Sequence, residues 1–251
     1  MLSLEGCQLA EVAYYRQHRW HLGRRRYASV CFSATANFVG SGVLGAIGVV
    51  TLTKVKHRRE LLFAALPTFF AIHQFIEGFV WLGLDGVLSP AVTHNMGAAF
   101  VLYAQGLLPF LMPLSILLFE PGMKSRRRML PFLIVGTGTT LYMLWALIAY
   151  PLRIYVQGDS IVYVDDGTNY TTLAVLYVIA TCGSLFFSKV RPMVLFGVAN
   201  LVILLAVMAV KRYAFTSLWC AYAAIASVII LGYFWKSRLT RPFKYAEAIW
   251  G

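Results

Sequence analysis

Long apolar runs separated by short polar, basic segments dominate the sequence. Seven runs can be distinguished, and each is long enough, at about 17–25 residues, to cross a hydrocarbon core about 30 Å thick. They cover residues 31–53, 61–84, 95–119, 129–150, 171–188, 192–210 and 214–235. They lack the alternation of barrel strands, and backbone groups in lipid must be paired within each segment. We therefore predict an all-α fold, a polytopic membrane bundle of seven transmembrane helices.

The distribution of lysine and arginine predicts the orientation of this bundle. Basic residues follow runs one, three, five and seven, and they are Lys54, Lys56, Arg58, Arg59, Lys124, Arg126, Arg127, Arg128, Lys189, Arg191, Lys236, Arg238, Arg241 and Lys244. The opposite loops carry only Arg153, Lys211 and Arg212. Because basic loops stay in the cytoplasm, we predict a multi-pass protein of the cell (plasma) membrane, with its N-terminal end outside and its C-terminus cytoplasmic.

The outer loop 151–170 contains two β-prone stretches on either side of Gly158 and Asp159. Alternating stretches that flank such a pair are typical of a β-hairpin. We expect a small hairpin on the outer surface, acting either as a structural lid or as a gate over a pocket.

Composition agrees with a membrane protein, since 59% of the residues are hydrophobic and only 13% are charged. Soluble domains carry about 25% charged residues. The net charge of +12 does not indicate nucleic-acid binding, because the basic residues form short clusters beside apolar runs. The lipid bilayer is therefore the expected partner, and no spacing among the four cysteines indicates a disulfide framework.

Glu77 is the acidic residue that lies deepest within an apolar run. His73, Gln74 and Trp81 are three or four residues away, so all four share one face of a helix. Ionisable groups in membrane helices are costly, face the bundle interior, and mark functional sites. The alternative is a polar network that only fixes helix packing. We favour a small-molecule pocket around Glu77.

Other polar residues are expected at a similar depth in the outer half. The candidate pocket comprises Glu77, Gln74, His73, Trp81, Cys31, Ser33, Gln105, Ser217 and Cys220. Cys31, His73, Glu77 and His94 are acceptable zinc ligands by type, although their spacing matches no recognised metal motif. The residues specify no cofactor.

Three segments resemble an uncharacterised bacterial seven-span membrane family. They are Cys31-Phe32-Ser33-Ala34-Thr35-Ala36-Asn37-Phe38, the element Gln74-x-x-Glu77-Gly78-x-x-Trp81, and Ser217-Leu218-Trp219-Cys220. Members typically begin Met-Cys-Phe-Ser-Ala-Thr-Ala and carry Gln-Gln-x-x-Glu-Gly-x-x-Trp in the second span. The resemblance covers about residues 30–235, and His73 stands in place of the first glutamine. It implies the architecture but no established activity.

The resemblance also bears on how the chain is organised. Val30 stands where members of the family have their initiator methionine, and residues 1–29 place five arginines on the outer side without a signal-peptide core. Residues 1–29 are either a real basic arm or, as we favour, an extension outside the natural protein. We expect 30–236 to form the seven-helix domain and 237–251 a cytoplasmic tail. Cys31 would then be the mature N-terminus, where its amine and thiol could bind a metal or act as a nucleophile.

Three functions fit these observations. The first is binding or sensing a small molecule in an outward-facing polar pocket around Glu77. The second is an intramembrane metal-dependent hydrolase, by analogy of fold alone. The third is a proton-coupled small-molecule transporter with Glu77 as the proton carrier.

Overall fold

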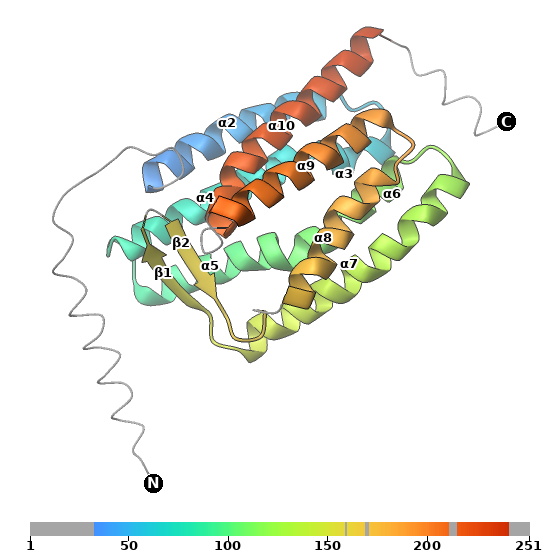
Figure 1. Ribbon diagram of the computed structural model, residues 1–251. Coiled ribbons are helices and arrows are strands. Elements are labelled where there is room, and N and C mark those ends of the chain that lie inside the picture. Colours follow the sequence, from blue (N-terminus) through green and yellow to red (C-terminus); the bar gives the residue numbers. More distant parts are fainter. Residues whose placement is uncertain (1–32, 159, 169–170, 211–214, 241–251) are drawn as a thin grey trace.

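The computed structural model describes residues 33–158, 160–168, 171–210 and 215–240, with the side chains of 191–192, 203–222 and 237–240 excluded (Figure 1). A helix lies at each of the seven predicted runs. The helices are α2 (Ala34–Thr53), α3 (Leu61–Ala64), α4 (Leu66–Leu84), α5 (Pro90–Val101), α6 (Leu108–Phe119), α7 (Met123–Ala149), α8 (Thr171–Phe186), α9 (Arg191–Val210) and α10 (Phe215–Thr240), with short helical segments η2 (Arg58–Glu60) and η3 (Leu102–Leu107).

Four helical stretches are long and apolar enough to cross a membrane. They are Ala34–Thr53, Arg58–Leu84, Pro90–Phe119 and Met123–Ala149. Among the other described residues, the apolar helical stretches are shorter, at Thr171–Phe186, Met193–Val202 and Ala223–Lys236. The structure therefore confirms a largely helical chain with several membrane-length helices.

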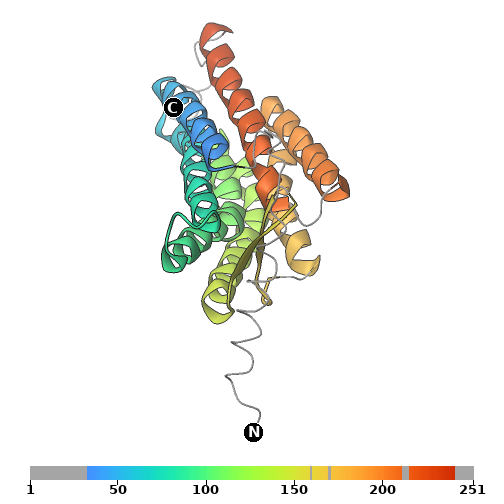
Figure 2. The same cartoon turned by 90° about the vertical axis from the view of Figure 1, so that its left-hand side faces the viewer.

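The helices run up and down, and most neighbours in sequence are also neighbours in space. Pairs α2–α4, α4–α5, α6–α7, α7–α8, α8–α9 and α9–α10 are in contact, α6 also contacts α8, and α10 returns to contact α2 and α4 (Figures 1 and 2). One end of the bundle carries the β-strands and is called the hairpin end here. The opposite end carries the loops around Lys54, Glu120 and Lys189, and is called the basic end.

Small residues let α2 and α4 approach closely. A Cβ placed on Gly48 would clash with Thr68, lying 2.8 Å from its backbone nitrogen. Ser41 Oγ donates a hydrogen bond across the same interface to the Ala71 carbonyl at 2.8 Å. By contrast, a Cβ on Gly42 would meet nothing within 4 Å. Glycines on one face of α2 therefore serve close helix packing, as small residues commonly do in membranes.

The third predicted run is interrupted by the π-helical segment η3. Leu108 N–H donates to the Tyr103 carbonyl, five residues earlier. Pro109 has no N–H to continue this pattern to Ala104. Tyr177 of α8 supplies the donor instead, and its hydroxyl bonds the Ala104 carbonyl at 2.8 Å. The proline thus produces a local change of helix type, which an external hydroxyl stabilises.

The predicted hairpin is present at one end of the bundle. β1 (Arg153–Gln157) pairs antiparallel with β2 (Ser160–Val164), with Gln157 opposite Ser160. Gly158 has φ of 63°, a conformation that glycine adopts without strain. Strand β2 is largely buried and contacts α10, whereas β1 is mostly exposed. The hairpin is therefore packed onto the bundle mainly by β2, while Ile154 of β1 packs against Gly97 of α5.

Candidate functional site

Glu77 lies inside the bundle, as the sequence predicts. Its side chain is fully buried, and His73, Gln74 and Trp81 are also buried on the same face of α4. Ile72 and Phe75, on the opposite face, are about half exposed. Helical spacing therefore separates a polar inner face from an apolar outer one.

Gln74 is held by a neighbouring helix. Its Nε2 donates to Asn37 Oδ1 at 2.5 Å, and Asn37 Nδ2 donates to the Ser33 carbonyl at 3.1 Å. A Cβ on Gly40 would lie 3.5 Å from Gln74 Nε2, so α2 comes close to this amide. Sequence reasoning did not identify Asn37, although it lies within the quoted Cys31–Phe38 motif. The structure pairs it with the second motif.

An aromatic stack connects this polar face to the hairpin. The His73 ring is stacked on Phe100 of α5, with ring centroids 3.9 Å apart. Phe100 is stacked in turn on Tyr163 of β2, with centroids 4.7 Å apart. The Tyr103 ring also lies near His73, with ring centroids 4.9 Å apart. The hairpin therefore packs over the part of α4 that carries His73, with the Phe100 ring between Tyr163 and His73.

Three polar atoms near this face have no hydrogen-bond partner within the described part of the chain. They are His73 Nε2, Trp81 Nε1 and the Tyr103 hydroxyl, and all three are buried. Burying such groups unpaired costs on the order of 1–3 kcal/mol each. Atoms of this kind are available to bind a polar ligand that reaches them.

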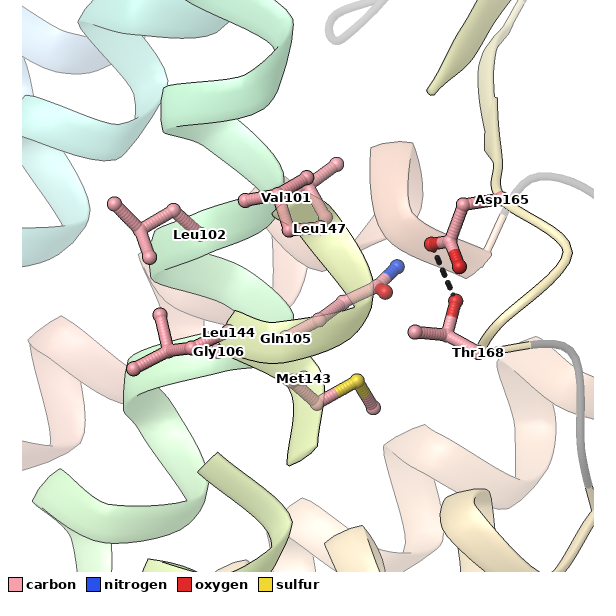
Figure 3. A pocket seen from close by; sticks show the side chains of 9 residues that line it. All are labelled: Val101, Leu102, Gln105, Gly106, Met143, Leu144, Leu147, Asp165 and Thr168. Carbon is pink, nitrogen blue, oxygen red and sulfur yellow. Dashed lines mark hydrogen bonds between the residues drawn. The ribbon is translucent and has the colours of Figure 1, made fainter. Parts of the chain in front are cut away.

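A crevice opens elsewhere, between η3, α7 and the loop after β2 (Figure 3). The Gln105 amide points into it toward Asp165 and Thr168, beside Met143 and Leu147. The crevice is too narrow to hold a water molecule. No residue of α4 lines it, so the structure places Gln105 in a different location from Glu77.

Of the remaining predicted site residues, Ser33 and His94 do not join the Glu77 face. Ser33 is exposed, and its Oγ caps α2 by accepting from Ala36 N at 3.2 Å. His94 is exposed near the start of α5. Cys31, together with segment 1–29, and the side chains of Ser217 and Cys220 lie outside the described residues. Among described residues, no group of three His, Cys, Asp or Glu could hold a metal ion.

A second buried carboxylate lies at the basic end, and sequence reasoning missed it. Glu120 is fully buried just after α6. It accepts hydrogen bonds from the hydroxyls of Ser125 and Ser188, and from Lys189 N–H at 3.0 Å. Its position at the end of an apolar run, beside a basic loop, resembles that of an ordinary interfacial charge. Only the fold brings the three donors to it.

Comparison with known proteins gives a family but no described relative. No curated protein and no solved structure matches the chain. A family profile matches residues 30–246, which include the described bundle. On this match, the chain belongs to DUF6629, a family of unknown function.

Proposed function

We propose that the chain is a seven-span protein of the cell membrane that binds a small molecule beside Glu77, in the half of the bundle nearest the hairpin. One observation supports this most strongly. A fully buried carboxyl group shares a helix face with His73 and Trp81, whose ring nitrogens His73 Nε2 and Trp81 Nε1 have no hydrogen-bond partner within the described chain. Ionisable groups inside membrane helices ordinarily serve function.

The seven-span topology extends what the four long apolar helices show. The three later helices alternate in direction with the earlier ones and close the bundle against α2 (Figures 1 and 2). At the basic end, Lys54 Nζ lies 4.6 Å from the centre of the Trp235 ring. This contact brings the end of α2 to that of α10, as expected when both ends face the cytoplasm. The hairpin end then faces outward.

The chemistry of the site defines a class of ligand. A carboxyl, an imidazole nitrogen, an indole N–H and a phenol offer both donors and acceptors. Phe100 and the ring of Tyr103 add aromatic walls next to His73. We infer a small molecule with a hydrogen-bonding, neutral or cationic head and a flat apolar body. Its apolar part would contact rings, as in most ligand pockets.

Entry to this site requires movement of the hairpin. Tyr163 of β2 covers Phe100, and Phe100 covers His73. Moving the Tyr163 ring out of this stack would uncover Phe100, the ring that lies against His73, without breaking a transmembrane helix. We therefore favour the gate function of the hairpin over that of a fixed lid.

The test is native mass spectrometry of the full-length protein purified in mild detergent from membranes of its own host. We expect a small molecule to co-purify with the wild type and to be lost from Glu77→Gln. Thr139→Val is the matched control, since Thr139 is buried on α7 and bonds only the Val135 carbonyl in the described structure. Identical bound species on wild type and Glu77→Gln would refute a site at Glu77.

A further inference from the structure

A row of buried hydroxyl groups runs along α8 toward the basic end. Tyr177, Thr181 and Ser184 are separated by four and three residues, so they lie on one face of the helix. Ser188 follows four residues later, just beyond the last turn. All four are buried, with exposures of 8% or less. In an otherwise apolar helix, this arrangement forms one polar track directed into the bundle.

The hairpin-end half of the track approaches the Glu77 face. The Tyr177 hydroxyl bonds the carbonyl of Ala104, the residue that follows Tyr103 in the chain. The Tyr103 ring lies 4.9 Å from His73. His73 precedes Glu77 by one helical turn on the same buried face. Tyr103 therefore stands between the polar face of α4 and that of α8.

The other half of the track ends at the second buried carboxylate. The Ser188 hydroxyl donates directly to Glu120. Ser125, another donor to Glu120, belongs to the basic segment that opens α7. Arg126 Nε donates to the Glu120 carbonyl at 3.1 Å, so the carboxylate lies directly beneath that segment. The track thus connects two fully buried carboxyl groups in opposite halves of the bundle.

We propose that this row is a path for protons across the bundle, from Glu77 through His73, Tyr103 and the α8 hydroxyls to Glu120. Chains of acidic, histidine and hydroxyl side chains form proton relays in pumps and transporters. Each hydroxyl accepts a proton on one side and releases its own on the other, so each step moves one proton and leaves every group as it was. The proposal goes beyond ligand binding, with which it shares Glu77, His73 and Tyr103.

The spacing sets a physical requirement. Residues three or four positions apart on a helix are separated by about 4.5–6 Å along its axis. A direct hydrogen bond does not cover that distance, so each interval requires one bridging water. Removing a hydroxyl from the middle of the row doubles one interval and should interrupt transfer.

Hydrogen bonds from these hydroxyls to carbonyl groups one helical turn earlier do not by themselves explain the row. Thr181 Oγ1 donates to the Tyr177 carbonyl at 2.8 Å, as many threonines in membrane helices do. Thr139 of α7 makes the same bond to Val135 and is equally buried, at 3% exposure for each. The two residues differ in that Thr181 lies in the row that ends at Glu120. They therefore form a matched pair for a test.

The experiment measures proton flux into liposomes that contain the purified full-length protein and a trapped pH-sensitive dye, driven by a valinomycin-clamped potassium gradient. Wild type should acidify the lumen faster than protein-free vesicles. Thr181→Val should slow this flux about tenfold or more, because one interval loses its bridging group. Thr139→Val should conduct like wild type. Ser184→Ala provides a second interruption if Thr181→Val does not fold.

Two results would overturn the path. Wild-type flux equal to that of protein-free vesicles excludes proton conduction, whatever the protein binds. Undiminished flux through Thr181→Val and Ser184→Ala excludes the α8 row. Ligand retention measured on the same variants separates the two proposals, since neither substitution touches the face of α4 that carries Glu77.

Discussion

The hydrogen bond between Gln74 and Asn37 joins α2 to α4 at two side chains that are almost completely buried. Bonds between membrane helices contribute about 1 kcal/mol. Leaving one buried partner without the other is more costly, at about 1–3 kcal/mol. Removing one partner of this hydrogen bond should therefore cost more stability than the bond itself contributes, whereas removing both leaves no buried polar group unpaired.

We expect Gln74→Met to lower the free energy of unfolding by about 1–3 kcal/mol, because Asn37 Oδ1 loses its donor. Asn37→Leu should have a similar cost. The double variant should cost less than the sum of the two, since no buried polar group is then left unpaired. Unfolding by SDS in mixed micelles, followed by circular dichroism, measures all three. Strictly additive costs would show that the two amides are not coupled.

Gly48 permits a contact that no other residue could make. We expect Gly48→Ala to destabilise the protein by about 1–3 kcal/mol, because the new methyl group meets the Thr68 backbone and forces α2 away from α4. Gly42→Ala is the matched control on the same helix, where a Cβ meets nothing within 4 Å. It should be neutral or slightly stabilising. Thermal unfolding in detergent compares them, and equal effects would contradict the packing argument.

At the scale of single elements, the π-helical segment η3 depends on two residues from different helices. Pro109 removes a donor from the Ala104 carbonyl, and the Tyr177 hydroxyl supplies another. The interaction therefore couples a backbone irregularity in one helix to a side chain on α8. Its strength can be measured by a double-mutant cycle.

We expect Tyr177→Phe to cost about 1–3 kcal/mol of stability, because the Ala104 carbonyl becomes buried and unpaired. In a Pro109→Ala background the cost should fall below about 1 kcal/mol, since residue 109 then offers its own N–H to the helix. SDS-driven unfolding of the four proteins in the cycle gives both values. A cost that is independent of residue 109 would show that the proline does not create the need for Tyr177.

The positions of helices and strands can be predicted from sequence where the pattern of apolar and polar residues along the chain determines them. The apolar runs located the α-helices of the described residues, and the alternation around Gly158 located the hairpin. The π-helical segment η3, which lies just before Pro109, was not predicted. This segment depends on Tyr177, which is 68 positions further along the chain and reaches Ala104 only in the folded bundle.

The candidate site was predictable only within one helix. Periodicity along α4 correctly placed His73, Gln74, Glu77 and Trp81 on one buried face. It could not identify partners from other elements, because spacing along one helix contains no information about its neighbours. Asn37, Phe100 and Tyr163 were therefore missed, and Gln105 was assigned to a site it does not join.

At the scale of the whole molecule, the direction of α8 decides between two topologies. If only the four long helices α2, α4, α5–α6 and α7 crossed the bilayer, the loops before and after α8 would face the same side. If α8 also crosses, Asp166 and Phe187 lie on opposite sides. Both residues are exposed, so each can be replaced by a cysteine that a reagent reaches.

We expect Phe187→Cys to be protected from a membrane-impermeant maleimide in intact cells and to react after permeabilisation, because Lys189 and Arg191 hold this loop in the cytoplasm. The background replaces Cys7, Cys31, Cys182 and Cys220 with alanine. Asn95→Cys should react in intact cells, and Arg127→Cys only after permeabilisation, so these exposed positions calibrate both sides. Labelling of Phe187→Cys in intact cells would leave α8 on the outer side. The hydroxyl row from Tyr177 to Ser188 would then not cross the bilayer, and neither the seven-span topology nor the proton path would stand.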